Sequence, residues 1–199
     1  MSGEGVPATR PVTLTGADGV VRCGWVTEVG DGLTDYHDRE WGTPVHDDAA
    51  VFRTLALTYF ENGLSWSLVF RKRDALCRAF ADFEPAAVAA MTDRDVDLLM
   101  RNAEIIRHRG KIKATVHNAR LLRSFSLADV AWRYRPRRRH PLRQWSDGRS
   151  QTAESEQLAT DLRRRGFRFV GPRVAHSFMQ AAGIENGHFD GCFRAVVDA

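Results

Sequence analysis

Two pairs of cysteine and histidine lie near opposite ends of the chain, and a site that joined them would constrain the whole fold. Cys23 and His37 lie in the N-terminal part, whereas His188 and Cys192 lie near the C-terminus. The spacing His188-x3-Cys192 suits a metal, but a single pair of this kind occurs often by chance. If the two ends of the chain meet, the four side chains form a Cys2His2 set suited to tetrahedral Zn²⁺. With no open coordination position, such a zinc would be structural.

The segment around His37 lacks the pattern of a strand or of a long helix. Residues 35–42 read DYHDREWG, with neither the alternation of a strand nor the apolar period of a long helix. Gly42 and then Pro44 indicate a turn. We therefore expect a loop or short helix, and a surface loop with a packed Trp41 fits these residues equally well.

Most of the remaining chain reads as amphipathic helices with recognisable caps. Helix starts are predicted at Asp47–Asp48, Ser65, Glu84–Pro85, Thr92, Arg109, Thr152 and Gly171–Pro172. Residues 127–149 are the least regular part, and alternating strand runs and internal repeats are absent. The predicted fold class is therefore all-α, with one domain over residues 21–199 after a flexible tail over residues 1–20.

Composition indicates the cellular compartment and the kinds of partner that the protein can have. The three cysteines are too few and too widely separated for a disulfide framework. No apolar run approaches the roughly 18 residues that span a bilayer, and the first residues do not resemble a secretory signal. We therefore expect a cytoplasmic protein that does not bind membranes. We also expect a monomer, and the sequence leaves the oligomeric state open. The net charge of +4 permits a polyanionic partner without requiring one.

A tight connection between two helices, residues 103–114, has the form of a helix-hairpin-helix. Ile105 and Ile106 can anchor the hairpin in the core, while backbone N–H groups at the start of the next helix face a phosphate. The candidate DNA contacts are Arg107, Arg109, Gly110 and Lys111. An ordinary αα-hairpin with a basic surface fits the same residues. The arginine-rich stretch 133–143 likewise fits either a solvated loop or a phosphate contact.

Five tryptophans are many for a chain of 199 residues. Trp25, Trp41 and Trp66 lie near the candidate metal ligands or at a helix start, and most buried aromatic side chains simply belong to the core. A pocket with aromatic walls is also what holds a nucleobase turned out of a duplex. A cationic alkylated base would gain about 0.5 to 2 kcal/mol from cation–π attraction there.

Five segments together resemble the DNA-3-methyladenine glycosylase I family. They read RCGW from Arg22, YHDREWG from Tyr36, GLSW from Gly63, IIRHRGKI from Ile105, and GFRFVG from Gly166 continuing to SFMQA at Ser177–Ala181. They occur in the family's order and cover nearly everything from Arg22 to Cys192.

The resemblance implies a fold, a site and a reaction. The fold would be an all-α helix-hairpin-helix glycosylase with one structural zinc held by Cys23, His37, His188 and Cys192. The base pocket would include Tyr36 and Trp66, with Trp25 and Trp41 nearby. The partner would be alkylated double-stranded DNA, and the reaction hydrolysis of the N-glycosidic bond of N3-methyladenine.

Two positions depart from the family pattern. Thr58 stands where the family has a pocket glutamate, so we treat Thr58 and Glu61, three residues on, as the candidate catalytic residues. Glu61 as a solvent-facing residue near a helix end is the alternative. Glu104 replaces a hairpin glycine, which predicts weaker DNA binding and strain if that position needs a positive φ.

The Thr58 substitution leaves two other functions open. The first is a paralogue that excises a different or bulkier adduct, because a threonine leaves room that a glutamate would fill. The second is a protein that binds damaged DNA or a nucleobase-like ligand without cleaving it. Release of a free base distinguishes the enzymes from the binding protein.

Overall fold

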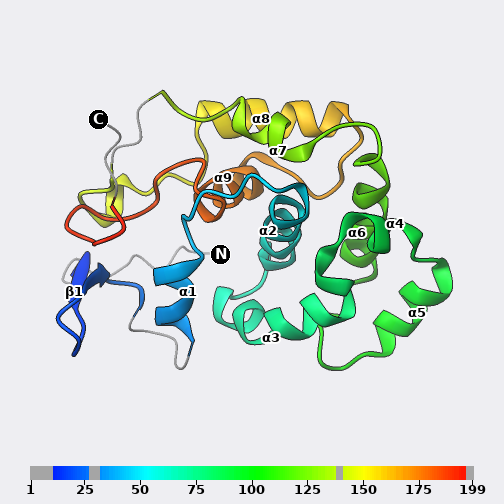
Figure 1. Cartoon of the computed structure of the whole chain (residues 1–199), viewed down its shortest axis with the longest axis horizontal. Coiled ribbons are helices and arrows are strands. Elements are labelled where there is room, and N and C mark those ends of the chain that lie inside the picture. Colours follow the sequence, from blue (N-terminus) through cyan, green and yellow to red (C-terminus); the bar gives the residue numbers. More distant parts are fainter. Residues whose placement is uncertain (1–10, 27–31, 138–140, 196–199) are drawn as a thin grey trace.

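The computed structural model describes residues 11–26, 32–137 and 141–195, and this part of the chain is mostly helical. Figure 1 shows the arrangement, with a small β-hairpin and α1 at one end and the longer helices at the other. The elements are β1 (Thr13–Thr15), β2 (Val21–Cys23), α1 (Leu33–Arg39), α2 (Asp48–Glu61), α3 (Trp66–Ala79), η2 (Ala81–Phe83), α4 (Pro85–Ala90), α5 (Asp93–Arg101), α6 (Arg109–Leu121), α7 (Leu127–Trp132), η3 (Trp145–Asp147), α8 (Ala153–Arg164) and α9 (Pro172–Ala181).

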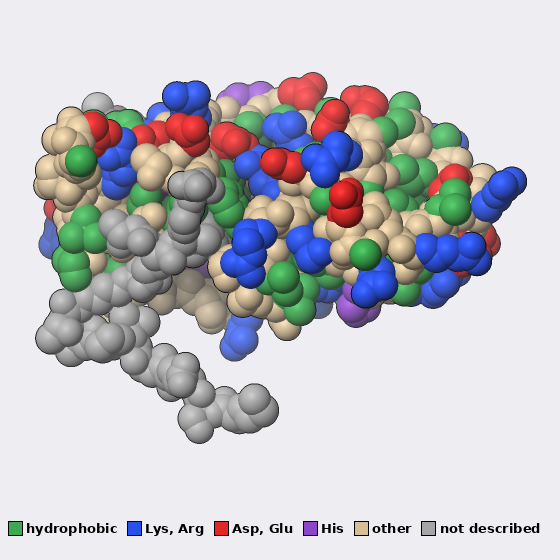
Figure 2. Space-filling view, turned by 90° about the horizontal axis from the view of Figure 1, so that it is seen from below, with side chains coloured by type: hydrophobic (Ala, Val, Ile, Leu, Met, Phe, Trp, Pro, Cys, Tyr) green, Lys and Arg blue, Asp and Glu red, His purple; other side chains and the backbone are tan. Residues whose placement is uncertain are grey.

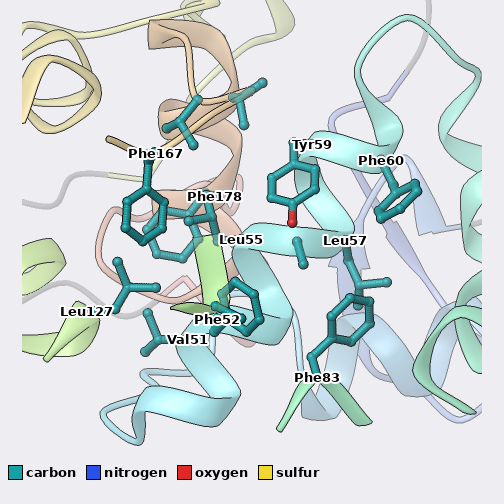
Figure 3. Close-up of a cluster of buried hydrophobic side chains, with 14 of the residues drawn as sticks. Val51, Phe52, Leu55, Leu57, Tyr59, Phe60, Phe83, Leu127, Phe167 and Phe178 are labelled. Atoms are coloured by element: carbon teal, nitrogen blue, oxygen red, sulfur yellow. The ribbon is translucent and has the colours of Figure 1, made fainter. Parts of the chain in front are cut away.

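Helix α2 forms the centre of the hydrophobic core. Its side chains from Val51 to Phe60 are buried nearly all round, as expected of a helix surrounded by other elements. Figure 3 shows Phe52 and Leu55 of α2 beside Phe167 and Phe178, which come from the C-terminal part of the chain. Helices α3, α6, α7 and α9 pack around α2. Packing in the core therefore fixes the position of α2 and of its side chains.

The predicted caps account for where several helices begin. The Asp47 side chain accepts a hydrogen bond from the Ala50 N–H at 2.9 Å at the start of α2. Thr92 and Asp95 form a reciprocal capping box at the start of α5, which satisfies two backbone donors. Thr152 caps α8 as predicted. Ser65 is the N-cap residue of α3, although its side chain makes no capping hydrogen bond.

The structure corrects two of the predictions about secondary structure. We expected a flexible tail up to residue 20, but β1 lies within that stretch and pairs with β2 in an antiparallel hairpin. Residues 1–10 lie outside the described part. The irregular stretch after Leu127 contains helix α7, because Ser126 caps it and the Asp48 carboxylate accepts hydrogen bonds from Ser126 Oγ and from the Ala128 N–H.

The two ends of the described chain lie together. The N–H of Phe193 donates to the carbonyl of Val21 at 2.9 Å, which joins the C-terminal segment to β2. Leu142 and Phe189 form an isolated parallel bridge, which joins the segment around Leu142 to the C-terminal segment. Figure 1 shows the red C-terminal segment beside the blue hairpin. Among the described residues, no helix has both the length and the apolar character to cross a membrane.

Candidate active site and metal centre

The four predicted metal ligands meet in one buried cluster. The ligand atoms of Cys23, His37, His188 and Cys192 all lie within 4.8 Å of one another. Cys23 Sγ is 3.5 Å from His188 Nδ1, and Cys192 Sγ is 3.4 Å from His37 Nε2. In a tetrahedral zinc site, sulfur and nitrogen ligand atoms lie about 3.5 Å apart, given Zn–S near 2.3 Å and Zn–N near 2.0 Å. The donor set and its spacing therefore fit a tetrahedral metal.

Asp38 orients His37, and Gly42 leaves room for the His188 ring. His37 Nδ1 lies 2.8 Å from an oxygen of Asp38, which leaves Nε2 facing the cluster. Asp38 is itself held by Arg22, whose Nε lies 3.0 Å from both carboxylate oxygens. Such a carboxylate–histidine pair fixes the ring tautomer at metal sites. Gly42 makes room for His188, since a Cβ there would lie 2.5 Å from His188 Nε2.

The two buried cysteines differ in acidity. The pKa of Cys192 lies well below its usual value, because the Cys23 thiol and the two imidazoles hydrogen-bond its sulfur. The pKa of Cys23 is raised by its hydrogen bond to Cys192 and by burial. A thiolate is the form of cysteine that binds zinc, so the cluster is prepared for a cation.

Trp25 and Trp41 belong to the surroundings of this cluster. Trp25 packs edge-on against His37 at 5.2 Å and against Trp41 at 5.0 Å between ring centroids. Trp41 packs edge-on against His188 at 4.6 Å. Neither tryptophan lines the cavity described next, and their part in base binding stays a prediction. They shield the metal ligands.

A cavity of about 180 Å³ lies between α1, α2 and α3. Its walls combine an aromatic ring, aliphatic groups and charged side chains. The residues that line it are Tyr36, Arg39, Glu40, Thr43, Val45, Arg53, Thr54, Leu57, Thr58, Glu61, Arg73 and Ala181. Three residues predicted for the site, Tyr36, Thr58 and Glu61, are thus brought together by the fold.

Two side chains from α3 contact the Tyr36 ring. The Arg73 guanidinium lies 5.0 Å from the ring centroid, and the Phe70 ring packs at 5.4 Å. Arg73 also forms a bidentate ion pair with Glu40, in which Nη1 lies 3.0 Å from Oε1. Although it is charged, the Arg73 side chain is only 19% exposed. Its recruitment depends on α1, which sequence periodicity within α3 cannot reveal.

Glu61 lines the cavity near the end of α2 and is partly buried. Burial raises the pKa of its carboxyl to about 8, and the positive charges of Arg73 and Lys111 offset only part of this effect. The alternative of a solvent-facing Glu61 is therefore wrong. A carboxyl with a strongly raised pKa in a cavity is a candidate functional group.

Thr58 is buried and lines the same cavity. Its hydroxyl donates to the carbonyl of Thr54 at 2.8 Å, so its oxygen is left to accept a hydrogen bond from a ligand. Trp66 begins α3, but its side chain lies outside the described structure, so its role in base binding stays a prediction.

The predicted hairpin joins α5 to α6. Ile105 and Ile106 are buried in the core as expected. Lys111 departs from the prediction, because its side chain is 4% exposed and points into the protein. Its Nζ donates to the carbonyls of Phe60 and Asn62 at 2.8 and 2.6 Å. The ammonium is therefore not a phosphate contact.

The outer surface of the hairpin is exposed and partly basic. Arg107 is exposed, and Arg109 is half-exposed and paired with Asp97 at 2.6 Å. At Gly110 a Cβ would lie 3.1 Å from the His108 ring, so glycine allows a close approach there. Glu104 has no positive φ, so the expected strain is absent. Figure 2 shows Lys and Arg side chains interspersed with Asp and Glu on the face seen from below.

A model of the methyladenine glycosylase family matches residues 25–195. A curated relative is DNA-3-methyladenine glycosylase 1 of Escherichia coli K12, 39% identical over 179 residues that cover 86% of this chain and 95% of the relative. DNA-3-methyladenine glycosylase of Haemophilus influenzae Rd is 35% identical over 86% of this chain and 96% of its own.

Solved structures agree with the sequence comparisons. A crystal structure of 3-methyladenine DNA glycosylase I superposes with a TM-score of 0.80 at 38% identity, covering 86% of this chain and 98% of that one. The Staphylococcus aureus enzyme, described in terms of 3-methyladenine recognition, gives a TM-score of 0.79 at 34% identity over 85% of this chain and 94% of that one. By its fold, the protein is a DNA base glycosylase. Among these enzymes, the chain belongs to the methyladenine glycosylase family.

Proposed function

We propose that the protein is a DNA base-excision glycosylase that hydrolyses the N-glycosidic bond of N3-methyladenine or a related alkylated purine. The observation that carries this proposal is a single cavity that combines the Tyr36 ring with the Glu61 carboxyl. The family relationship supplies the reaction class, and the relatives above are named for 3-methyladenine. An aromatic wall and a carboxyl suit a flat, positively charged base.

The reaction needs little acid–base help. The alkylated ring is already cationic, so the C1′–N9 bond breaks with its electron pair going to the base, which leaves neutral. Water adds to C1′ and gives up one proton. The protein's task is to hold the base outside the duplex and favour the state in which the charge moves.

Glu61 supplies the carboxyl that Thr58 cannot. A cationic base beside Glu61 favours its ionised form, because opposite charges lower a carboxyl pKa. Thr58 accepts a hydrogen bond from the base edge with its oxygen, since its proton is engaged by Thr54. A hydrogen bond to a charged group contributes about 1.5 to 3 kcal/mol against about 1 for a neutral pair. Most of the discrimination therefore falls to Glu61.

The partner is alkylated duplex DNA, bound through a helix-hairpin-helix. Arg107 and Arg109 lie on the exposed side of the turn, and the first turn of α6 offers backbone N–H groups to a phosphate. Such contacts position the duplex without reading its sequence. One Zn²⁺ held by Cys23, His37, His188 and Cys192 would join the two ends of the chain. With four protein ligands the ion would supply stability rather than water activation.

The test is to incubate the protein with methylated duplex DNA and to identify the released bases chromatographically, with a no-protein control for spontaneous depurination. Release of 3-methyladenine above this control is the expected result. Binding of methylated DNA without release of any base would contradict the proposal and leave a damage-binding protein. Release of only a bulkier adduct from suitably alkylated DNA would correct the substrate.

A further inference from the structure

Lys111 connects the hairpin to the base cavity. It lies in the first turn of α6, and its Nζ reaches the carbonyl oxygens of Phe60 and Asn62 at 2.8 and 2.6 Å. These two residues flank Glu61 in the sequence. The lysine therefore fixes the backbone on both sides of the cavity carboxyl.

These bonds complete the end of α2. In the turn at Gly63, which has a φ of 82°, the Leu64 N–H donates to the carbonyl of Glu61, whereas the carbonyls of Phe60 and Asn62 accept from Lys111. Burying an ammonium is costly, and burial lowers the pKa of Lys111 while the charge of Glu61 raises it. Lys111 therefore ties α6 to the two carbonyls that the turn at Gly63 does not engage.

Glu61 depends on this backbone support. Within the described part of the chain, its carboxyl makes no hydrogen bond to another residue, whereas Glu40 in the same cavity is held by Arg73. The charged and titratable groups that act on Glu61 are Arg73 from α3, Lys111 from α6 and Tyr36 from α1. Only Lys111 also holds the backbone on either side of Glu61.

We infer that Lys111 is a positioning residue that sets Glu61 in the base cavity relative to the DNA-binding hairpin, an inference that rests on the function proposed above. Lys111 then fixes the position of Glu61, which contacts the base, relative to the first turn of α6, which contacts the duplex. Misplacing a reacting group by about 1 Å can cost on the order of 10²-fold in rate.

The experiment compares Lys111→Met, Lys111→Arg and the control Arg120→Met with the wild type. Arg120 donates to the carbonyls of Ala89 and Met91 at 3.0 and 2.7 Å, so its variant loses the same kind of bond away from both α2 and the hairpin. Two readouts are taken: base release at saturating and limiting DNA, and the Glu61 pKa from carboxyl NMR. Lys111→Arg keeps the positive charge and guards against a variant that fails to fold.

Both Lys111 variants should lose about 10- to 100-fold in release at saturating DNA, with DNA affinity and its salt dependence unchanged. Lys111→Met should also raise the Glu61 pKa, because a neighbouring positive charge is gone, while Arg120→Met matches the wild type in both readouts. Wild-type release by Lys111→Met would overturn the inference, as would a loss confined to DNA affinity. If the wild type itself released no base, the proposed function would be wrong. An unchanged Glu61 pKa in Lys111→Met would overturn the inference about Lys111 independently of base release.

Discussion

Cys23 Sγ lies 3.5 Å from His188 Nδ1, although the two residues are 165 positions apart in the chain. The contact closes the chain on itself and fixes α1, because His37 of α1 belongs to the same cluster. Tyr36, next to His37, forms a wall of the cavity. The metal centre and the base cavity are therefore coupled through one short helix.

Removing the metal should destabilise the protein. A structural zinc contributes several kcal/mol to folding, and 1 kcal/mol shifts the Tm of a chain of this size by about 2 to 4 °C. We expect a strong chelator to lower the Tm by at least about 5 °C. Thermal unfolding with and without chelator, together with metal analysis of the purified protein, measures this.

Two cysteine variants provide the control. Cys192→Ser should lose the zinc, whereas Cys77→Ser should keep one equivalent, because Cys77 lies on α3 away from the cluster. If purified wild-type protein contains no zinc and its Tm does not change with chelator, the prediction of a structural zinc is wrong.

Glu61→Gln should stabilise the protein at high pH. The folded-state pKa of Glu61 is about 8 against 4.5 for an ordinary glutamate, so the folded protein binds the proton more tightly than the unfolded chain. Wild-type stability therefore falls as the pH rises from 4.5 to about 8 and then levels off. The glutamine variant lacks this loss.

Thermal unfolding at pH 5 and pH 8.5 tests this prediction. We expect a Tm advantage of at least about 2 °C for Glu61→Gln at the higher pH and a smaller one at the lower pH. Glu84→Gln removes an exposed carboxyl and should follow the wild type. An advantage for Glu61→Gln that is equal at both pH values would show that burial does not raise its pKa.

Arg107→Ala should weaken DNA binding without changing which DNA sequence is bound. Each phosphate contact contributes about 0.9 to the slope of log K against log salt concentration, so the variant should lose about that amount. Binding titrations at several salt concentrations measure the slope. Arg123→Ala, an exposed change at the other end of α6, should leave it unchanged, and an unaltered slope in Arg107→Ala would remove this residue from the interface.

Much of the fold could be predicted from local signals. Asp47, Thr92 and Thr152 cap helices where the sequence indicated, because a cap depends only on residues three positions apart. Strands β1 and β2 are three residues each and too short for a readable alternation. Helix α7 depends on Asp48, which lies 78 positions before its cap Ser126, and a local pattern carries no such information.

The site was predictable where the chemistry is unusual and not where it depends on packing. Four metal-type side chains form an uncommon set, and the structure brings them together. Lys111 looks like any basic residue of the hairpin, and only the position of α2 shows that its ammonium is used inside the protein. Trp25 and Trp41 lie near the metal ligands in the sequence, and the structure packs their rings on His37 and His188.

The most direct measurement is the single-turnover rate of 3-methyladenine release from methylated duplex DNA by the wild type and Glu61→Gln. We expect Glu61→Gln to lose about 10- to 150-fold in this rate, the equivalent of a charge-assisted hydrogen bond of about 1.5 to 3 kcal/mol. Introducing Thr58→Glu into that variant should restore part of the rate, because it returns a carboxyl to the same cavity. An unchanged rate in Glu61→Gln would contradict the assignment of Glu61 as the carboxyl that holds the base.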